Sequence, residues 1–323
     1  MTTVKVGVIG VGALGRHHAR LYTQCDDVEL VGVYDQNTER AREVAEEVGG
    51  VSVYETPELL ADAVEGVSIA VPTDLHFDVV KGMLGRHKHV LVEKPITETV
   101  VQAEELVRLA AASGLVLGVG HVERYNPVLE CLDKTPGEPR FIEAHRLAAY
   151  PPPRPGLRPR GTEVSVVLDL MIHDIDILLS LVKSEVKRVD AVGVPVLSET
   201  EDIANARLVF ANQCVANLTA SRVSAESLRK LRVFKSDAYL SLDYQDHCGE
   251  IAYKGDHGII RESVPVHDCN ALKVELEDFC RCIGEVKAGA RRSEPRVTGR
   301  HGLEALRVAD RIAASIKEND LSD

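Results

Sequence analysis

The stretch Val4–Leu21 constrains the fold more than any other part of the sequence, because it reads as a strand, a glycine-rich turn and a helix in that order. Val4–Ile9 is a β-branched run of the length of a buried strand. The turn has the pattern GxGxxG, in which the first glycine permits a tight turn, the second lets a pyrophosphate approach the backbone, and the third lets the helix pack against the sheet. Free N–H groups at the start of such a helix favour phosphate. The pattern predicts a dinucleotide-binding βαβ unit whose pyrophosphate contacts are Gly10, Gly12, Ala13, Leu14 and Gly15.

Asp35 follows the second predicted strand, Val28–Tyr34, and indicates which dinucleotide binds. A carboxylate at this place accepts hydrogen bonds from the ribose hydroxyls and repels a 2′-phosphate. Gln36 comes next, and no arginine occurs between Asp35 and Arg40. The sequence therefore favours NAD over NADP as the cofactor, with Asp35 and Gln36 near its adenosine ribose.

Six predicted strands alternate with helices up to about residue 122, which is typical of a doubly wound parallel sheet. In such sheets, ligands bind beyond the carboxyl ends of the strands. The residues that follow those ends are therefore expected around one cofactor crevice. They are Asp35, Pro72, Thr73, His76, Glu93, Lys94 and His121.

The pattern changes after residue 122, where strand-like segments follow one another with turn signals and few helices between them. This indicates a largely antiparallel sheet. Helices are predicted at Glu163–Val182, Asn270–Gly284 and Arg300–Lys317. Because 323 residues are too many for a comfortable single core, we expect an α/β protein of two domains. These are an NAD-binding domain of residues 1–122 and an α+β substrate domain of residues 123–323, whose helix at about 300–317 packs back on the first domain.

Composition excludes several classes of protein. The net charge of −12 disfavours nucleic acid and anionic membranes as general partners, and no apolar run approaches the length of a membrane span. The seven cysteines are scattered without CxxC spacing, which argues against a disulfide framework or a structural zinc and for a reducing compartment. Because the chain enters a strand almost at once, no signal peptide is expected, and the predicted location is the cytoplasm.

Lys94 lies within Glu93-Lys94-Pro95, at the end of a buried strand and beside the predicted cofactor crevice. An ammonium there can bind a substrate hydroxyl and stabilise the alkoxide that develops during oxidation. The alternative interpretation is an ordinary surface lysine in a loop.

The helix predicted at Glu163–Val182 carries a second group of reactive side chains. At 100° per residue, Asp169, His173 and Asp176 fall within one narrow stripe of a mostly apolar helix. Buried charges are costly unless they are paired or used, and a neutral histidine held by a carboxylate is a good general base near neutral pH. The alternatives are a thin solvated stripe and a metal site. No cysteine or second histidine supports the metal site, and none is predicted.

The segment Arg146–Thr162 contains four arginines and no acid, in a chain of net charge −12. Arginine suits bidentate binding of phosphate, and the prolines of this segment lower the entropy lost on closing over a ligand. Because the segment leads directly into the predicted helix, it is expected to hold an anionic substrate beside the base. The alternative is a solvated surface loop. The arginines are Arg146, Arg154, Arg158 and Arg160.

These motifs occur in the order found in the Gfo/Idh/MocA oxidoreductases, and the chain resembles that family over essentially its whole length. They are GxGxxG with Asp35, Pro72-Thr73 with His76, Glu93-Lys94-Pro95, Arg124-Tyr125-Asn126-Pro127, and Asp169 with His173 and Asp176. The resemblance implies a Rossmann domain followed by an open-faced α/β domain that also mediates oligomerisation, as a homodimer or homotetramer, through the outer face of its sheet. It further implies that Lys94, Asp169 and His173 form the catalytic set. The residues predicted to contact substrate are Lys94, Arg124, Tyr125, Arg146, Arg158, Arg160, Asp169, His173 and Asp176.

The helix sequence departs from the family in one respect, because glycines often surround the aspartate where this chain has Val166, Val167 and Met171. The stretches GHVERYNP and VSVVLDLMIHDIDILLSLV look most like the branch that includes UDP-N-acetylglucosamine 3-dehydrogenases, which act on the way to an amino-sugar lipid A. The resemblance therefore implies NAD-dependent oxidation of a secondary hydroxyl of a nucleotide sugar, the 3-hydroxyl in that branch.

Three other functions stay open at this level. The first is a dehydrogenase of a free sugar, inositol or other polyol. The second is a relative with aldolase- or hydrolase-like chemistry that recycles its NAD. The last is a dinucleotide-binding regulator without catalysis. The arginine-rich segment argues against the first, and the presence of Lys94, Asp169 and His173 argues against the last.

Overall fold

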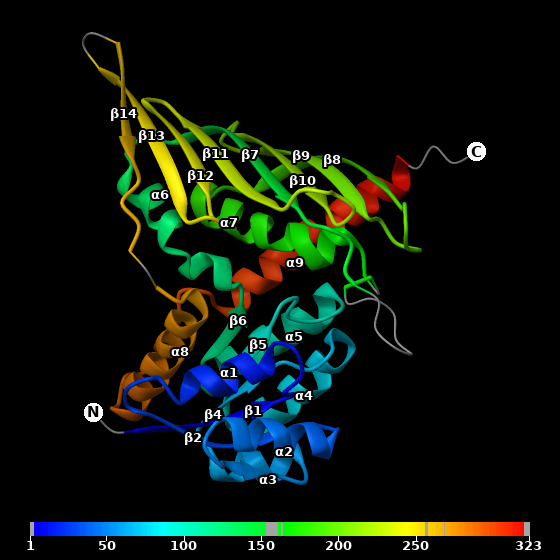
Figure 1. Ribbon diagram of the computed structural model, residues 1–323, viewed down its shortest axis with the longest axis vertical. Helices are drawn as coiled ribbons and strands as arrows, with labels where there is room; N and C mark the ends of the chain where they lie inside the picture. Colours follow the sequence, from blue (N-terminus) through cyan, green and yellow to red (C-terminus); the bar gives the residue numbers. More distant parts are fainter. Residues whose placement is uncertain (1–2, 153–160, 163, 256–257, 268, 320–323) are drawn as a thin grey trace. The chain divides into compact units, whose positions relative to one another are not determined.

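The computed structural model describes residues 3–152, 161–162, 164–255, 258–267 and 269–319 (Figure 1). The chain forms two compact units. Unit 1 contains Met1–Tyr125 and Asn270–Leu303, and unit 2 contains Asn126–Cys269 and Glu304–Asp323. The first crossing between the units lies close to the boundary predicted at residue 122, whereas the return of residues 270–303 to unit 1 differs from that prediction.

Unit 1 is built on a six-stranded sheet in the order β3-β2-β1-β4-β5-β6, in which all paired neighbours run parallel. The strands are β1 (Val4–Ile9), β2 (Val28–Tyr34), β3 (Ser52–Val53), β4 (Gly66–Ile69), β5 (His89–Glu93) and β6 (Leu117–Gly120). The strand order reverses between β1 and β4, and doubly wound sheets bind ligands at such a switch point. The predicted doubly wound parallel sheet is confirmed.

The helices of unit 1 begin and end at residues whose local chemistry sets the boundary. Thr56 accepts a hydrogen bond from the backbone of Leu59 and is followed by a proline at the first helical position. Thr99 and Gln102 form a capping box at the start of α5, which ends at Gly114 with a left-handed φ of +66°. These helices are α1 (Gly15–Tyr22), α2 (Thr38–Glu47), α3 (Pro57–Ala63), α4 (Thr73–Gly85) and α5 (Val100–Ser113).

The helix α8 (Ala271–Lys287) returns to unit 1 because its apolar face completes that core. Leu276, Phe279 and Ile283 belong to the same buried cluster as side chains of β1, α1 and α2. The last helix, α9 (Gly299–Glu318), starts in unit 1 but buries Val308 and Ile312 in the core of unit 2. The whole of α8 thus belongs to unit 1, whereas α9 contributes its first residues to unit 1 and the rest, from Glu304 on, to unit 2.

Unit 2 contains an eight-stranded sheet in the order β14-β13-β12-β11-β7-β10-β9-β8 (Figure 1). Its neighbours pair antiparallel except β7 and β10, which run parallel. The predicted, largely antiparallel sheet is confirmed. The strands are β7 (Pro139–Leu147), β8 (Val186–Val194), β9 (Ile203–Phe210), β10 (Val215–Ser221), β11 (Leu228–Lys235), β12 (Ala238–Asp243), β13 (Cys248–Gly255) and β14 (Gly258–Ser263).

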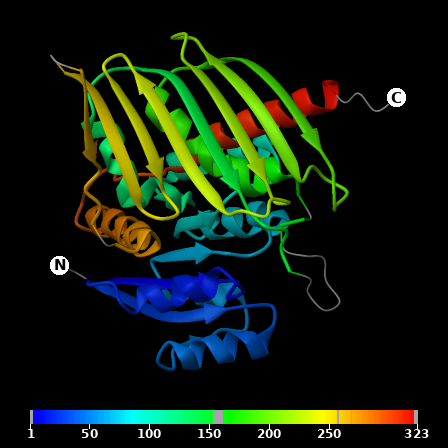
Figure 2. The same cartoon turned by 45° about the horizontal axis from the view of Figure 1, so that its top comes forward.

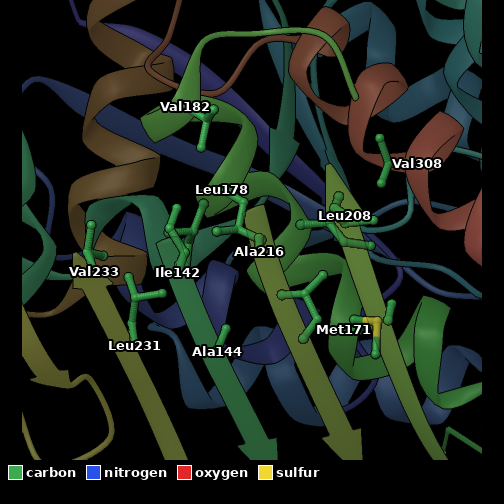
Figure 3. Close-up of a cluster of buried hydrophobic side chains, with 14 of the residues drawn as sticks. Ile142, Ala144, Met171, Leu178, Val182, Leu208, Ala216, Leu231, Val233 and Val308 are labelled. Atoms are coloured by element: carbon green, nitrogen blue, oxygen red, sulfur yellow. The ribbon is translucent and has the colours of Figure 1, made fainter. Parts of the chain in front are cut away.

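Helices cover one face of the unit 2 sheet. Figure 3 shows Leu178 and Val182 of α7 (Ile172–Val182) over Ile142 of β7 and Ala216 of β10. In the part of the chain that the structure describes, no helix covers the opposite face, which Figure 2 turns toward the viewer. Alternation along β7, β9, β10 and β12 leaves one side of each of these strands in the core and the other on the open face, whereas β14 is exposed along its whole length.

Helical turns occupy the end of the first segment of unit 1, the start of unit 2 and the approach to α7. The turns η1 (Val122–Tyr125) and η2 (Pro127–Leu129) and the helix α6 (Glu130–Lys134) precede β7, in a region without a predicted helix. Before α7, Val167–Met171 forms a π-helical turn, η3, where an α-helix is predicted. A π-turn contains more residues than an α-turn and often occurs at functional sites.

No helix among the described residues is both long enough and apolar enough to cross a membrane.

Candidate active site

The glycine-rich turn between β1 and α1 has the geometry that a pyrophosphate requires. Gly10 has a φ of +83°, which L side chains rarely adopt. A Cβ on Gly15 would lie 1.8 Å from the carbonyl oxygen of Gly10, so only glycine fits there. Around Gly12 nothing lies within 4 Å of the position a Cβ would take, and Gly12 and Ala13 are exposed just before α1. Leu14 is the N-cap residue of α1 and makes no side-chain capping hydrogen bond, so no capping side chain competes with an anion at the start of this helix.

Asp35 lies at the end of β2 and links that strand to the glycine-rich turn. One carboxylate oxygen accepts a hydrogen bond from the Val11 N–H at 2.8 Å, and the other accepts from the Asn37 N–H at 2.8 Å. Each carboxylate oxygen has a second lone pair, so the half-buried group can still receive ribose hydroxyls. Gln36 beside it is exposed.

Arg40 lies closer to the dinucleotide turn than its distance in sequence from Asp35 suggests. Its Nε donates to the Val11 carbonyl at 3.2 Å, and its guanidinium pairs with Glu43 at 3.0 Å. The N-cap residue Asn37 starts α2 here, and its side chain accepts a hydrogen bond from the Arg40 N–H at 3.1 Å. That N-cap is the sequence signal that could have located Arg40.

His76 lies in the first turn of α4, which starts at Thr73 with Pro72 as its N-cap residue. Both ring nitrogens face backbone carbonyls, Nδ1 that of Pro95 at 2.8 Å and Nε2 that of Val71 at 3.0 Å. Burial lowers the pKa of His76, although the two carbonyls oppose this shift. The imidazole therefore joins the chain after β4 to the chain after β5, and the predicted side-chain contact of His76 with the cofactor gains no support from this geometry.

Glu93 is buried at the end of β5 and accepts a hydrogen bond from His18 of α1, with Nε2 and Oε1 3.0 Å apart. Its other oxygen is 3.3 Å from the backbone N–H of Lys94. Burial alone would raise the pKa of Glu93, but the hydrogen bond and charge of His18 outweigh it and lower the pKa. The Glu93 carboxylate thus connects the glycine-rich helix to the backbone of Lys94, a structural role that sequence reasoning did not anticipate.

Lys94 itself is half-buried just beyond β5, at the carboxyl edge of the parallel sheet. His121 is buried just beyond β6, at the same edge. Both residues therefore lie at the ends of strands, as predicted.

Tyr125 donates its hydroxyl to Asp278 of α8 at 2.9 Å, within unit 1. Arg296 lies over its ring, with the guanidinium carbon 4.9 Å from the ring centroid, and donates to the carbonyl of Arg124 at 2.9 Å. Burial, followed by the charge of Asp278, raises the pKa of Tyr125 far above its usual value. Tyr125 therefore fastens η1 to α8, and its hydroxyl is engaged within the protein.

Asp169 lies on η3 and His173 on α7, both half-buried, whereas Asp176 is buried. Because the π-turn contains more residues than an α-turn, it reduces the angular offset between Asp169 and His173 relative to a regular helix. The structure thus places this predicted pair on consecutive turns of one helical segment.

Arg146 points into the core of unit 2, where it is 3% exposed and pairs with Asp174, which is 2% exposed. Its Nε is 2.9 Å from Asp174 Oδ2, and the Tyr244 hydroxyl donates to the same carboxylate. This corrects the prediction of Arg146 as a substrate contact. The residue is in phase with the inward-facing Ile142 and Ala144 of β7, and this alternation is the signal that could have shown its burial.

Arg154, Arg158 and Arg160 lie outside the described residues. Among the residues that are described, no group of three or more His, Cys, Asp or Glu side chains could hold a metal ion.

Two family models match the chain. One, described as an oxidoreductase family with an NAD-binding Rossmann fold, matches residues 4–121, and the other, described as a GFO/IDH/MocA C-terminal domain, matches residues 132–241. The chain is 39% identical to the UDP-N-acetylglucosamine 3-dehydrogenase of Acidithiobacillus ferrooxidans over 290 residues, which cover 88% of this chain and 90% of that protein. It is 25% identical to a scyllo-inositol 2-dehydrogenase (NAD(+)) of Bacillus subtilis over 297 residues, covering 87% and 86% of the two chains. A solved structure of the Acidithiobacillus ferrooxidans enzyme matches with a TM-score of 0.89 at 35% identity, covering 98% of this chain and 99% of that one.

Proposed function

The chain belongs to the Gfo/Idh/MocA family of oxidoreductases and is therefore an enzyme, and from this premise we propose that it is an NAD-dependent dehydrogenase of a nucleotide sugar. The substrate we propose is UDP-N-acetylglucosamine, oxidised at its 3-hydroxyl to the 3-keto sugar. The observation that carries this proposal is the 39% identity to a UDP-N-acetylglucosamine 3-dehydrogenase, since it extends over 88% of the chain and so includes both units.

The residues around the glycine-rich turn fit a dinucleotide. The open space beside Gly12 leaves room for a pyrophosphate at the start of α1, and Asp35 keeps lone pairs for ribose hydroxyls. When bound, the nicotinamide ring supplies the hydride acceptor that oxidation requires.

Three side chains would carry the rest of the chemistry. Lys94 of unit 1 would bind the substrate hydroxyl oxygen and stabilise the negative charge that develops on it. His173 of unit 2 would take the proton of the same hydroxyl as a general base. Asp169, one turn before His173, would orient the imidazole and balance the charge that it gains. Oxidation releases one proton from the hydroxyl, and His173 is its acceptor in this scheme.

We propose NAD rather than NADP because a carboxylate repels the 2′-phosphate. Replacing Asp35 with serine is expected to lower kcat/KM for NAD by about tenfold and to raise it for NADP, since Arg40 would then lie near an unopposed phosphate. The measurement is steady-state kinetics with both cofactors at saturating sugar. Glu43→Gln, which removes only the partner of Arg40, is the control, and equal use of both cofactors by the wild type would contradict the proposal.

A substrate panel tests the proposed function. We expect kcat/KM for UDP-N-acetylglucosamine to exceed that for N-acetylglucosamine and myo-inositol by at least about 10³-fold, because each charge-assisted phosphate contact contributes about 1.5–3 kcal/mol. Activity with the free sugar or inositol alone would favour the polyol dehydrogenase. Turnover of sugar without net change in the cofactor absorbance would favour a recycled cofactor, and binding without turnover would favour a regulator.

We also propose that the chain forms a homodimer or homotetramer through the open face of the unit 2 sheet (Figure 2). Phe141, Phe234 and Tyr239 cluster there, with ring centroids 5.8 and 4.7 Å apart along the row. Aromatic side chains are enriched at the centres of interfaces. Light scattering is expected to give two or four copies for the wild type and a smaller assembly for Phe234→Glu. A monomeric wild type would contradict this proposal.

A further inference from the structure

Arg222 and Asp202 form a buried ion pair in unit 2 that the proposed mechanism does not use. Arg222 follows β10 and is 2% exposed, and Asp202 precedes β9 and is 0% exposed. The Arg222 Nε and Asp202 Oδ1 atoms lie 2.7 Å apart. Burying two charges is costly unless further hydrogen bonds satisfy them, so the remaining partners of this pair indicate what it holds.

The other donors of Arg222 converge on two segments of backbone. One terminal nitrogen donates to the carbonyls of Gly161 at 2.5 Å and Val164 at 2.8 Å. The second donates to the hydroxyls of Ser198 at 2.9 Å and Thr200 at 2.8 Å. The guanidinium therefore joins the chain just before η3 to the loop that precedes β9.

Asp202 fixes the same loop from its other side. Its Oδ2 accepts backbone N–H groups from residues 196, 197 and 198, and its Oδ1 accepts the Ser198 hydroxyl at 2.7 Å. Burial would raise the pKa of this carboxyl, but the hydrogen bonds from Ser198, Arg222 and the backbone outweigh it and hold the pKa well below its usual range. Asp202 therefore stays ionised, and the pair remains intact at neutral pH.

Gly161, whose carbonyl Arg222 holds, packs directly against the carboxylate of Asp169. Its φ is +83°, and a Cβ on it would lie 2.4 Å from Asp169 Oδ2. The chain from Val164 onward starts the helical segment of Asp169, since the Asp169 N–H donates to the Ser165 carbonyl at 3.0 Å. The Val166 N–H donates to the backbone carbonyl of Glu201 at 2.9 Å. The segment that Arg222 anchors thus contacts both the side chain and the backbone of Asp169.

We propose that Arg222, fixed by Asp202, is a positioning residue that sets the carboxylate of Asp169 relative to His173. This inference rests on the proposed pairing of Asp169 with His173. It assigns to Arg222 no contact with substrate or cofactor.

The first test uses Arg222→Lys, which keeps the positive charge but loses the planar fork that reaches several acceptors. We expect kcat for UDP-N-acetylglucosamine to fall about tenfold with KM for NAD unchanged, because unit 1 is unaltered. The pH profile of kcat is also expected to shift, since a displaced carboxylate changes the pKa of the base beside it. An unchanged kcat and pH profile would overturn the proposal.

The second test needs no activity and does not depend on Arg222→Lys folding. Gly161→Ala places a methyl group against Asp169, whereas Gly137→Ala is a matched control with a φ of +91° and a Cβ position 2.8 Å from Ser236 Oγ. The pKa of His173, measured by NMR on histidine-labelled protein, is expected to fall in Gly161→Ala and in Asp169→Asn by about one unit and to stay constant in Gly137→Ala.

The two experiments separate failure of this inference from failure of the proposed function. If Asp169→Asn lowers the pKa of His173 but Gly161→Ala and Arg222→Lys do not, the positioning role is wrong and the pairing stands. If Asp169→Asn leaves the pKa of His173 unchanged, the pairing is wrong and the positioning role has no target. If all three variants lower the pKa but no sugar nucleotide is oxidised, the proposed substrate is wrong and the positioning role stands.

Discussion

Replacing Lys94 with alanine is expected to lower kcat by about 10²–10⁴-fold, because the variant loses the charge that we propose stabilises the developing alkoxide. KM for NAD should change little, since the proposed pyrophosphate contacts lie on the glycine-rich turn and not on β5. The measurement is steady-state kinetics of NADH formation with the best substrate of the panel. Near-wild-type turnover by Lys94→Ala would contradict the assigned role.

Two further variants separate the chemistry of Lys94 from its surroundings. Lys81→Ala removes an exposed lysine of the same unit, paired with Glu105 at 2.8 Å, and should leave kcat unchanged. Lys94→Arg keeps the charge but places a larger planar group at the site, so partial activity is expected. If Lys81→Ala lowered kcat as much as Lys94→Ala, the effect would reflect general charge or stability rather than catalysis.

Replacing His173 with alanine is expected to lower kcat by about 10²–10⁴-fold and to abolish the acidic limb of the pH profile, because this variant lacks the proposed general base. In the wild type, activity should fall as pH drops and His173 gains a proton, since only the neutral imidazole accepts the substrate proton. Asp169→Asn should lower kcat by a smaller factor and shift that limb to lower pH, because the carboxylate no longer stabilises the protonated imidazole. An unchanged acidic limb in His173→Ala would show that another group titrates.

Asp174 provides the contrast for Asp169, since the two carboxylates lie on the same helical segment in different surroundings. Asp174 is buried against Arg146 and Tyr244, so Asp174→Asn should destabilise the protein by about 3–5 kcal/mol by leaving the Arg146 charge without its partner. Asp169 is half-buried, and Asp169→Asn should mainly change kcat. Chemical denaturation measures the first effect. Equal destabilisation by both variants would argue that Asp169 is structural.

Local patterns predicted most of the strands and helices because each is set by its own residues. The predicted strands Val4–Ile9 and Val28–Tyr34 begin and end in the structure where their sequence pattern places them. The glycine-rich turn was recognisable for the same reason, since each of its glycines answers a steric demand inside a short segment.

Contacts between distant segments account for what the sequence did not reveal. The amphipathic pattern of α8 shows that one face is buried but not which core it completes. Arg146 and Arg222 are both in phase with the inward side chains of the neighbouring strands β7 and β10, yet burial of an arginine is credible only once its partner is known. Those partners, Asp174 and Asp202, are 28 and 20 residues away.

Several polar side chains that were predicted to contact ligands instead form hydrogen bonds within the protein. Three residues at predicted site positions show this. His76 hydrogen-bonds the carbonyls of Pro95 and Val71. Glu93 hydrogen-bonds His18, and Tyr125 hydrogen-bonds Asp278. A motif shows that such a residue lies near the site. It does not show whether the side chain contacts the ligand or instead fixes a loop that contacts the ligand.

The most direct test of the central claim is the fate of the hydrogen on carbon 3 of the sugar. The protein would be incubated with NAD and UDP-N-acetylglucosamine carrying deuterium at that carbon, and the reduced cofactor examined by mass spectrometry. Oxidation at carbon 3 would place one deuterium in each NADH formed and give slower turnover than with the unlabelled sugar. NADH without deuterium would show that a different carbon is oxidised, and no NADH with or without label would contradict the proposed dehydrogenase activity on this sugar.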